Sequence, residues 1–331
     1  MNVLILGGTR NLGPGLVAEL LARGHRVAVC NRGITPDDLP GSVTRLRADR
    51  RDREELARAL GDRRFDAVVD TALYTGAEAR DAVTLLDGRT GHYVAISSGQ
   101  VYLVRAGVAP PFAEEDYEGP VMPEPPRSSR DGADWKYGAD KRDAEDVLAA
   151  AAAEHGFPAT VLRLPMVHGE RDHCGRLHNY IARLADGGPI VLPEGAHLAI
   201  RHVDAADVVR AVADLVERGA GRGRAYNLGQ DETLSIEECL GLLARAAGRP
   251  LALVRVARAT LVAEELLPAC SPFSGTWMSA LDNRRSKAEL GVAYTPVAAT
   301  LERLVRHYAR LPPPPGYAQR PRELALARGG S

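Results

Sequence analysis

The stretch NVLILGGTRNLG, residues 2–13, decides the fold. It begins with a continuous apolar run that is too short for a helix and ends at Gly7, which predicts a strand buried on both faces. Gly7, Gly8 and Gly13 lie on the turn into a helix, where glycine permits a tight turn and the helix N-terminus can face a pyrophosphate. A plain tight turn is the alternative interpretation. Because the turn follows a strand of an α/β pattern, we expect a dinucleotide-binding loop.

Strands and helices alternate through the first half of the chain. Helices are expected at residues 12–23 and near 52–60. Further apolar segments have the length and flanks of buried strands: 25–31, 65–71, 92–98 and 159–164. This alternation predicts an α/β fold built on a Rossmann-type doubly wound parallel sheet.

The alternation loosens in the second half, which predicts a smaller mixed α/β C-terminal substrate domain. We expect a dinucleotide-binding domain at 1–165, with returning segments at about 200–228, and an interleaved substrate-binding domain at 166–310. The proline-rich residues 311–331 are expected to form an extended tail. Prolines and acidic residues at 105–134 predict a long surface loop.

Composition excludes several classes of protein. The net charge is −1 and no run of Lys or Arg could track phosphates, so we expect no nucleic-acid partner. No segment reaches the ~18 apolar residues of a membrane span and no targeting segment is visible, so we expect a cytoplasmic protein without a membrane partner. The four cysteines form no CxxC pair, which favours reduced thiols.

The residues after the second expected strand favour NADP. The dinucleotide fingerprint places an acidic residue there, on the ribose 2′-hydroxyl. This chain has Asn31, Arg32 and Gly33, with no carboxylate until Asp37. A guanidinium suits a 2′-phosphate, and Arg10 could supply a second positive charge from the glycine loop. We therefore expect NADP, with NAD as the alternative; solvated surface arginines are the other interpretation.

Three further motifs follow in order along the chain: Asp49-Arg-Arg-Asp52, AISSGQVY at 95–102 and Tyr137-Gly-Ala-Asp-Lys141, which reads Y-x-x-x-K. Together with the glycine loop they resemble the extended short-chain dehydrogenase/reductase superfamily, a group of NAD(P)-dependent epimerases, dehydratases and ketoreductases. The resemblance covers roughly residues 2–310 and is strongest to about residue 170.

The resemblance implies a catalytic set of Ser98, Tyr137 and Lys141. Residues four apart on a helix share a face, so Lys141 can lie beside the tyrosine hydroxyl and the nicotinamide ribose. Its ammonium, together with the positive nicotinamide, would lower the pKa of Tyr137 from ~10 toward neutrality and make it an acid or base. Ser98 would hydrogen-bond the reacting oxygen.

The resemblance also implies binding residues. The expected cofactor contacts are Gly7, Gly8, Thr9, Arg10, Asn11, Leu12, Gly13, Asn31, Arg32, Asp49, Arg50, Thr71, Ala72, Lys141, Pro165 and Val167. The expected substrate contacts are Gln100, His168, Asn179 and Arg201, the last near where relatives place an arginine on a nucleotide diphosphate. A packed core histidine at 168 and a surface arginine at 201 are the alternatives. Residues His168, His173, Cys174 and His178 lack a recognised zinc-ligand spacing, so no metal is expected.

The residues after the catalytic serine narrow the reaction. Sugar 4,6-dehydratases of this superfamily carry Asp-Glu where this chain has Gly99 and Gln100, which disfavours dehydration. Epimerisation of a carbinol carbon, on a nucleotide sugar or similar substrate, has a slight lead over NADPH-dependent ketoreduction. A non-catalytic NADP- or RNA-binding relative is a remote alternative. The alanine-rich run at 144–155 could form one face of a homodimer.

Overall fold

The computed structural model describes residues 1–329 and is built around one seven-stranded sheet. The strand order is β10-β6-β5-β4-β1-β2-β3 and every neighbouring pair is parallel. The strands are β1 (Asn2–Leu6), β2 (Arg26–Asn31), β3 (Thr44–Arg47), β4 (Ala67–Asp70), β5 (Tyr93–Ser98), β6 (Ala159–Leu164) and β10 (Arg224–Asn227). The order turns back at β1, where β2 and β4 flank it, so the Rossmann-type fold expected from the sequence is confirmed.

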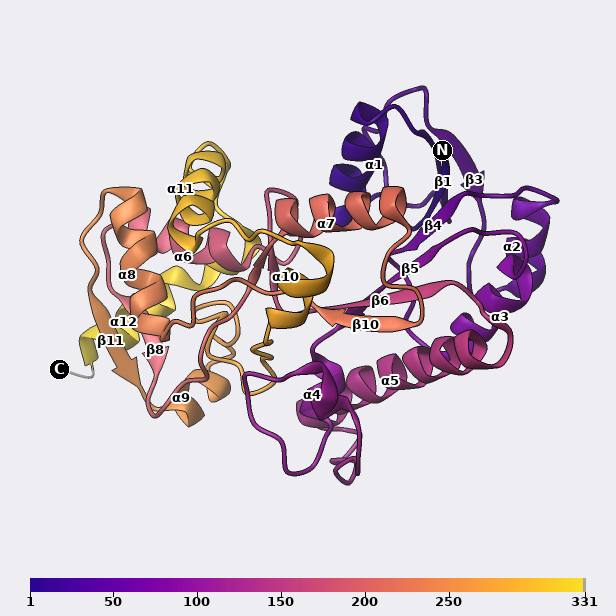
Figure 1. Cartoon of the computed structure of the whole chain (residues 1–331). Helices are drawn as coiled ribbons and strands as arrows, with labels where there is room; N and C mark the ends of the chain where they lie inside the picture. The colour runs from indigo at the N-terminus through magenta and orange to yellow at the C-terminus, as the bar shows by residue number, and fades with distance from the viewer. Residues whose placement is uncertain (330–331) are drawn as a thin grey trace.

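Helices cover both faces of this sheet (Figure 1). On one face α1 (Leu12–Ala22) and α7 (Ala205–Arg218) pack their apolar residues into one core with β1 and β2. On the other face lie α2 (Arg53–Leu60), α3 (Gly76–Leu86) and the long α5 (Arg130–His155). The short α4 (Gln100–Leu103) follows β5 and packs against α5. Lys141 of α5 thereby reaches the carboxyl end of β5, where it bonds the carbonyl of Ile96.

The second half of the chain forms a further layer of helices beside the carboxyl ends of the strands (Figure 1). It contains α6 (Arg176–Ala185), α8 (Ile236–Ala247), α9 (Arg258–Ala263), α10 (Arg284–Leu290) and α11 (Val297–Tyr308). Two small parallel pairs accompany them, β7 (Val167–His168) with β9 (Val203–Asp204) and β8 (Ile190–Pro193) with β11 (Leu253–Val256). Apolar residues of α6, α8, α11 and β8 share a separate core. The domain boundary near residue 165 stays a prediction.

The extended tail expected after residue 311 is wrong. The 3-10 helix η2 (Pro315–Gln319) leads into α12 (Arg320–Gly329), and residues 330–331 lie outside the described chain. Buried polar partners explain the docking, because Arg320 binds Asp186 and Glu323 binds Arg183.

The surface loop expected at 105–134 is wrong in part. It contains the 3-10 helix η1 (Glu114–Tyr117), and α5 already begins at Arg130. Phe112 and Tyr117 are buried in one cluster with Tyr102, which fixes the segment against α4. Among the helices of residues 1–329, none combines the length and apolarity needed to cross a membrane.

Candidate active site

The glycine loop joins β1 to α1 and has the close backbone approach that a dinucleotide requires. Gly7 and Gly8 adopt φ values of +102° and +88°, which disfavour side chains. A Cβ on Gly13 would stand 2.4 Å from the carbonyl carbon of Gly8, so only glycine lets α1 begin this close to the strand. Asn11, at the start of α1, makes no side-chain capping hydrogen bond to the helix. The first N–H groups of α1 are thus suited to a phosphate, and these residues fit the expected cofactor.

A cavity of about 1130 Å³ extends from this loop across the carboxyl ends of the strands. Most of the expected cofactor residues line it: Gly7, Gly8, Thr9, Arg10, Asn11, Leu12, Asn31, Arg32, Asp49, Arg50, Thr71, Ala72, Lys141, Pro165 and Val167. Gly13 does not line it and acts in the packing of α1. The far wall comes from residues 268–279, 314–316 and the start of α6.

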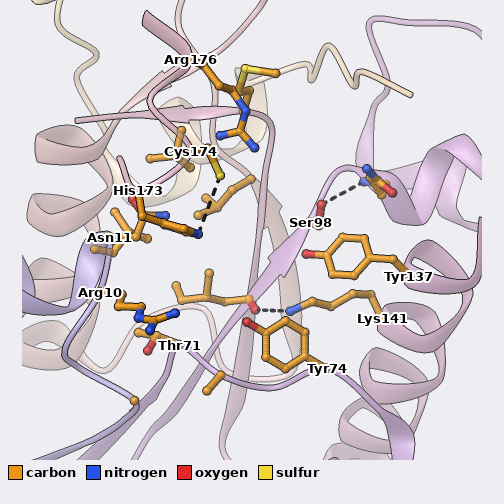
Figure 2. Close-up of a pocket in the computed structure, with 18 of the residues that line it drawn as sticks. Arg10, Asn11, Thr71, Tyr74, Ser98, Tyr137, Lys141, His173, Cys174 and Arg176 are labelled. Carbon is orange, nitrogen blue, oxygen red and sulfur yellow. Dashed lines mark hydrogen bonds between the residues drawn. The ribbon is translucent and has the colours of Figure 1, made fainter. Parts of the chain in front are cut away.

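The three expected catalytic side chains meet at the middle of this cavity. Ser98 ends β5, while Tyr137 and Lys141 lie one turn apart on α5, and Ser98 and Tyr137 point toward one another (Figure 2). Gly138 explains how α5 comes so close to α4: a Cβ there would stand 2.6 Å from the carbonyl oxygen of Gln100. The sequence reasoning thus named three residues that the fold does bring together.

Lys141 is held by backbone carbonyls. Its Nζ donates to the carbonyl of Leu73 and, at 3.0 Å, to that of Ile96. The side chain is 5% exposed, and burial lowers the pKa of Lys141 to about 8. The ammonium stands 5.9 Å from the centre of the Tyr137 ring, where its charge can stabilise a phenolate.

Tyr137 has a pKa that lies above the usual value, because burial disfavours its charged form. A hydrogen bond with Ser98 opposes this rise and the neighbouring Tyr74 adds to it. The fall toward neutrality expected from Lys141 and a positive nicotinamide is therefore not produced by the protein side chains alone. The protein side chains thus favour the neutral phenol of Tyr137.

An arginine that the sequence reasoning missed, Arg47, holds Asn31 at the ribose end of the cavity without lining the cavity itself. Asn31 donates to the carbonyl of Gly7 at 3.1 Å, and its side-chain oxygen accepts from Arg47 Nη1 at 2.5 Å. Arg47 ends β3 in register with Asn31, so recognising the strand TRLR would have placed it here. Arg32 is exposed beside this pair and lines the cavity. Arg10 instead lies beside Thr71 (Figure 2).

Two expected cofactor residues already have protein partners. Asp49 pairs with Arg51 at 2.6 Å, and this hydrogen bond lowers the pKa of Asp49 to about 2. Arg50 donates to both carboxylate oxygens of Asp70, at 2.7 and 2.6 Å. The guanidinium of Arg50 therefore fixes the end of β4, while the residue itself lines the cavity.

The expected substrate residues divide into two groups. Gln100 and Asn179 line the cavity, whereas His168 and Arg201 do not. His168 is buried against Phe273, and its Nε2 lies 2.7 Å from Nδ1 of His202. The Arg201 guanidinium donates to the carbonyl of Gln230 at 3.1 and 3.3 Å. Core packing and a backbone contact therefore account for His168 and Arg201 in this structure.

The four residues considered as zinc ligands are not gathered at one point. The ligand atoms of His173 and Cys174 lie, with those of Asp172, within 4.8 Å of one another. His168 bonds His202, and His178 stacks on Tyr308 with 4.7 Å between ring centres. Asp172 also accepts from two backbone N–H groups, those of residues 174 and 176.

The nucleotide-binding fold agrees with comparisons to known proteins. The chain belongs to the NAD dependent epimerase/dehydratase family, whose model matches residues 3–229. This confirms the expected superfamily and NAD(P) dependence as a class; the choice between NAD and NADP is left to the proposal below.

The particular relatives span several reactions. The 2'-dehydrokanamycin reductase of Streptomyces kanamyceticus is 29% identical over 254 residues, covering 76% of this chain and 68% of the relative. The dTDP-glucose 4,6-dehydratase of Bacillus anthracis, solved with NAD, superposes with a TM-score of 0.72 and 16% identity over 94% of this chain and 97% of that chain. The UDP-glucose 4-epimerase of Thermotoga maritima, solved with UDP-glucose, gives 0.70 and 21% over 94% and 99%. Because a dehydratase is among them, the comparisons do not support the exclusion of dehydration drawn from Gly99 and Gln100.

Proposed function

We propose that this protein is an NADPH-dependent reductase that converts a ketone on a sugar-type substrate to the alcohol. The observation that carries the proposal is that Tyr137 faces Ser98 in the cavity that the glycine loop enters. A protonated tyrosine is a proton donor, which is the role that ketone reduction requires. The relative that is a named reductase supports the same direction.

Ser98, Tyr137 and Lys141 each have a separate role in the proposed reduction. NADPH supplies the hydride when bound. Ser98 Oγ hydrogen-bonds the carbonyl oxygen and holds it beside the hydroxyl of Tyr137. As hydride reaches the carbon, Tyr137 gives its proton to the oxygen, so the C=O becomes CH–OH. Lys141 stabilises the phenolate that remains until a solvent proton replaces the one lost.

The preference for NADP rests on the end of β2. Asn31 stands where a carboxylate would bind a 2′-hydroxyl, and its side chain is occupied by Gly7 and Arg47. Arg32 is exposed beside it and makes no hydrogen bond or ion pair within residues 1–329, so it is available to a 2′-phosphate. The end of β2 thus offers the guanidinium group of Arg32 and no carboxylate.

We expect Arg32→Ser to weaken NADP⁺ binding about tenfold while leaving the Kd for NAD⁺ within about twofold, because one charge-assisted contact to the 2′-phosphate is lost. The measurement is titration of the apoprotein with each dinucleotide. Arg58→Ser is the control, since Arg58 is an exposed arginine that pairs with the exposed Glu54, and neither residue lines the cavity. Equal losses for both dinucleotides in Arg32→Ser would remove the 2′-phosphate role.

We expect kcat/KM for reduction to fall as the pH rises through about 8, because Lys141 loses its charge there. The lowered pKa means that the ammonium is present below pH 8 and absent above it, so the phenolate left on Tyr137 is then unsupported. A pH profile with NADPH in excess measures this fall. Lys141→Gln should be slow at every pH and lack the fall; a profile unchanged in that variant contradicts the role.

Epimerisation, which the sequence slightly favoured, is the second candidate because the fold is shared with a UDP-glucose 4-epimerase. NADPH carrying deuterium at the transferred position separates the candidates when it is mixed with methyl glycosides oxidised at one ring carbon. Reduction consumes NADPH and places deuterium on the new carbinol carbon. An epimerase keeps its cofactor, which denaturation and mass spectrometry would detect, and shows no net consumption. A product that has lost water would instead indicate a dehydratase.

Two sequence expectations remain proposals, homodimerisation through α5 and a cytoplasmic location. The third, a nucleotide sugar as substrate, is kept as the alternative to a sugar without a nucleotide diphosphate. The Arg201 side chain, which the sequence placed on a nucleotide diphosphate, does not line the cavity. We therefore favour a sugar-type substrate without that group.

A further inference from the structure

The substrate end of the cavity presents a carboxylate that the proposed reaction does not use. Asp134 lies on α5 one turn before Tyr137 and lines the same cavity. Residues three or four apart share one side of a helix, so Asp134 and the catalytic tyrosine face the same space. Asp49 is the other acidic residue that lines the cavity within the described chain, and it is held by Arg51 at the far end.

The ion-pair partner of Asp134 does not prevent this carboxylate from binding a ligand. The nearest cation is Arg130 Nε at 3.7 Å, and the Arg130 side chain is 76% exposed. Exposed ion pairs at this separation contribute little free energy, so the Arg130 side chain can leave Asp134 for solvent at small cost. Burial raises the pKa of Asp134 above its usual value, which marks a carboxylate that lacks a close compensating charge.

A second acceptor lies on the neighbouring helix. Gln100 also lines the cavity, and its Oε1 is buried without a hydrogen-bond partner among residues 1–329. Gly138 packs onto the backbone of Gln100, and Asp134 lies one turn before Gly138 on the same side of α5. Both acceptors therefore line the cavity where α4 and α5 pack together. A buried acceptor without a partner favours a ligand that brings N–H or O–H donors.

An aromatic ring completes this end of the cavity. Trp277 lines the cavity, and its indole Nε1 donates to Asp131 Oδ1 at 2.8 Å. Asp131 lies one turn before Asp134, so this bond fixes the indole beside the first turns of α5. Indole faces attract cations, which adds a second preference for positive charge.

We propose that the substrate carries a protonated amine, and that Asp134 binds this amine with Gln100 Oε1 and the Trp277 ring beside it. The inference rests on the proposed function and deepens it, because it names the substrate class as amino sugars. Asp134 is a specificity-determining residue and takes no part in proton transfer. Its carboxylate orients the sugar so that the ketone meets Ser98 and Tyr137.

The test measures binding to the NADP⁺-loaded protein, without turnover. The probes are methyl 2-amino-2-deoxy-α-D-glucopyranoside, its N-acetyl counterpart and UDP-glucose, each titrated by ligand-observed NMR. We expect the amine to bind about tenfold more tightly than the acetamide, since one charge-assisted hydrogen bond is worth about that factor. Asp134→Asn should abolish this preference and leave the acetamide unchanged.

Asp140→Asn is the matched control. Asp140 is on the same helix and pairs with the exposed Lys136, and it does not line the cavity. It should keep the preference for the amine. Asp134→Ser serves as a second variant, and NADP⁺ binding checks that each variant is folded.

The inference is overturned if the amine has no advantage, if neither sugar binds, if Asp134→Asn keeps the preference, or if UDP-glucose binds more tightly than the amine. These results leave NADPH-dependent reduction standing, because reduction is judged by NADPH consumption and deuterium transfer. Loss of hydride transfer with the amine preference intact would overturn the proposed reaction and leave the binding site.

Discussion

Tyr137→Phe should lower kcat for ketone reduction about a thousandfold, because it removes the proton donor and little else. Binding of NADP⁺ should stay within about twofold of the wild type, since Lys141 is held by the carbonyls of Leu73 and Ile96 rather than by the tyrosine hydroxyl. Single-turnover NADPH oxidation under saturating substrate measures the chemical step, and dinucleotide titration measures binding.

Tyr74→Phe provides the control for this experiment. It makes the same chemical change on a ring whose centre lies 6.5 Å from that of Tyr137, and both residues line the cavity. Tyr74 is 49% exposed and stands over the Lys141 ammonium at 4.8 Å. Its hydroxyl has no part in the proposed proton transfer, so kcat should stay within about twofold. Equal losses in the two variants would mean that Tyr137 acts through packing.

The sequence allowed the catalytic centre to be predicted because local rules control it. A short apolar strand followed by glycines fixes the turn at Gly7 and Gly8, and a Y-x-x-x-K spacing fixes Tyr137 and Lys141 on one side of a helix. The apolar run before Ser98 was enough to predict the strand that carries it. These features depend on a few neighbouring residues, so they can be predicted without knowledge of tertiary contacts.

The substrate end could not be predicted in the same way. Asp134 and Trp277 are 143 positions apart, and only the long-range bond from Trp277 to Asp131 brings the indole to α5. Arg47 was missed because the four-residue strand β3 is too short to give a clear alternating pattern. His168 and Arg201 were assigned by position along the chain, which gives no information on where their side chains point.

Glu323→Gln should lower the free energy of unfolding by about 3 to 5 kcal/mol, because it leaves the buried Arg183 without its anion. Both Arg183 and Glu323 have side chains that are 0% exposed, and Arg183 Nε donates to Glu323 at 2.9 Å. Arg320 Nη1 donates to the same carboxylate at 3.2 Å. The proline-rich sequence before α12 predicted an extended tail. The ion pair between Glu323 and Arg183 joins residues 140 positions apart, so local sequence gives no sign of it.

Urea denaturation measures the global loss, and amide hydrogen exchange in α12 detects undocking of that helix alone. Glu264→Gln is the control, because Glu264 pairs with Arg322 of α12 at 2.7 Å while both side chains are about half exposed. That exposed pair should contribute less than about 1 kcal/mol. If Glu323→Gln changes neither unfolding nor exchange more than Glu264→Gln does, the buried ion pair does not hold α12. The cavity residues 314–316 would then owe their position to the preceding prolines rather than to the docked helix.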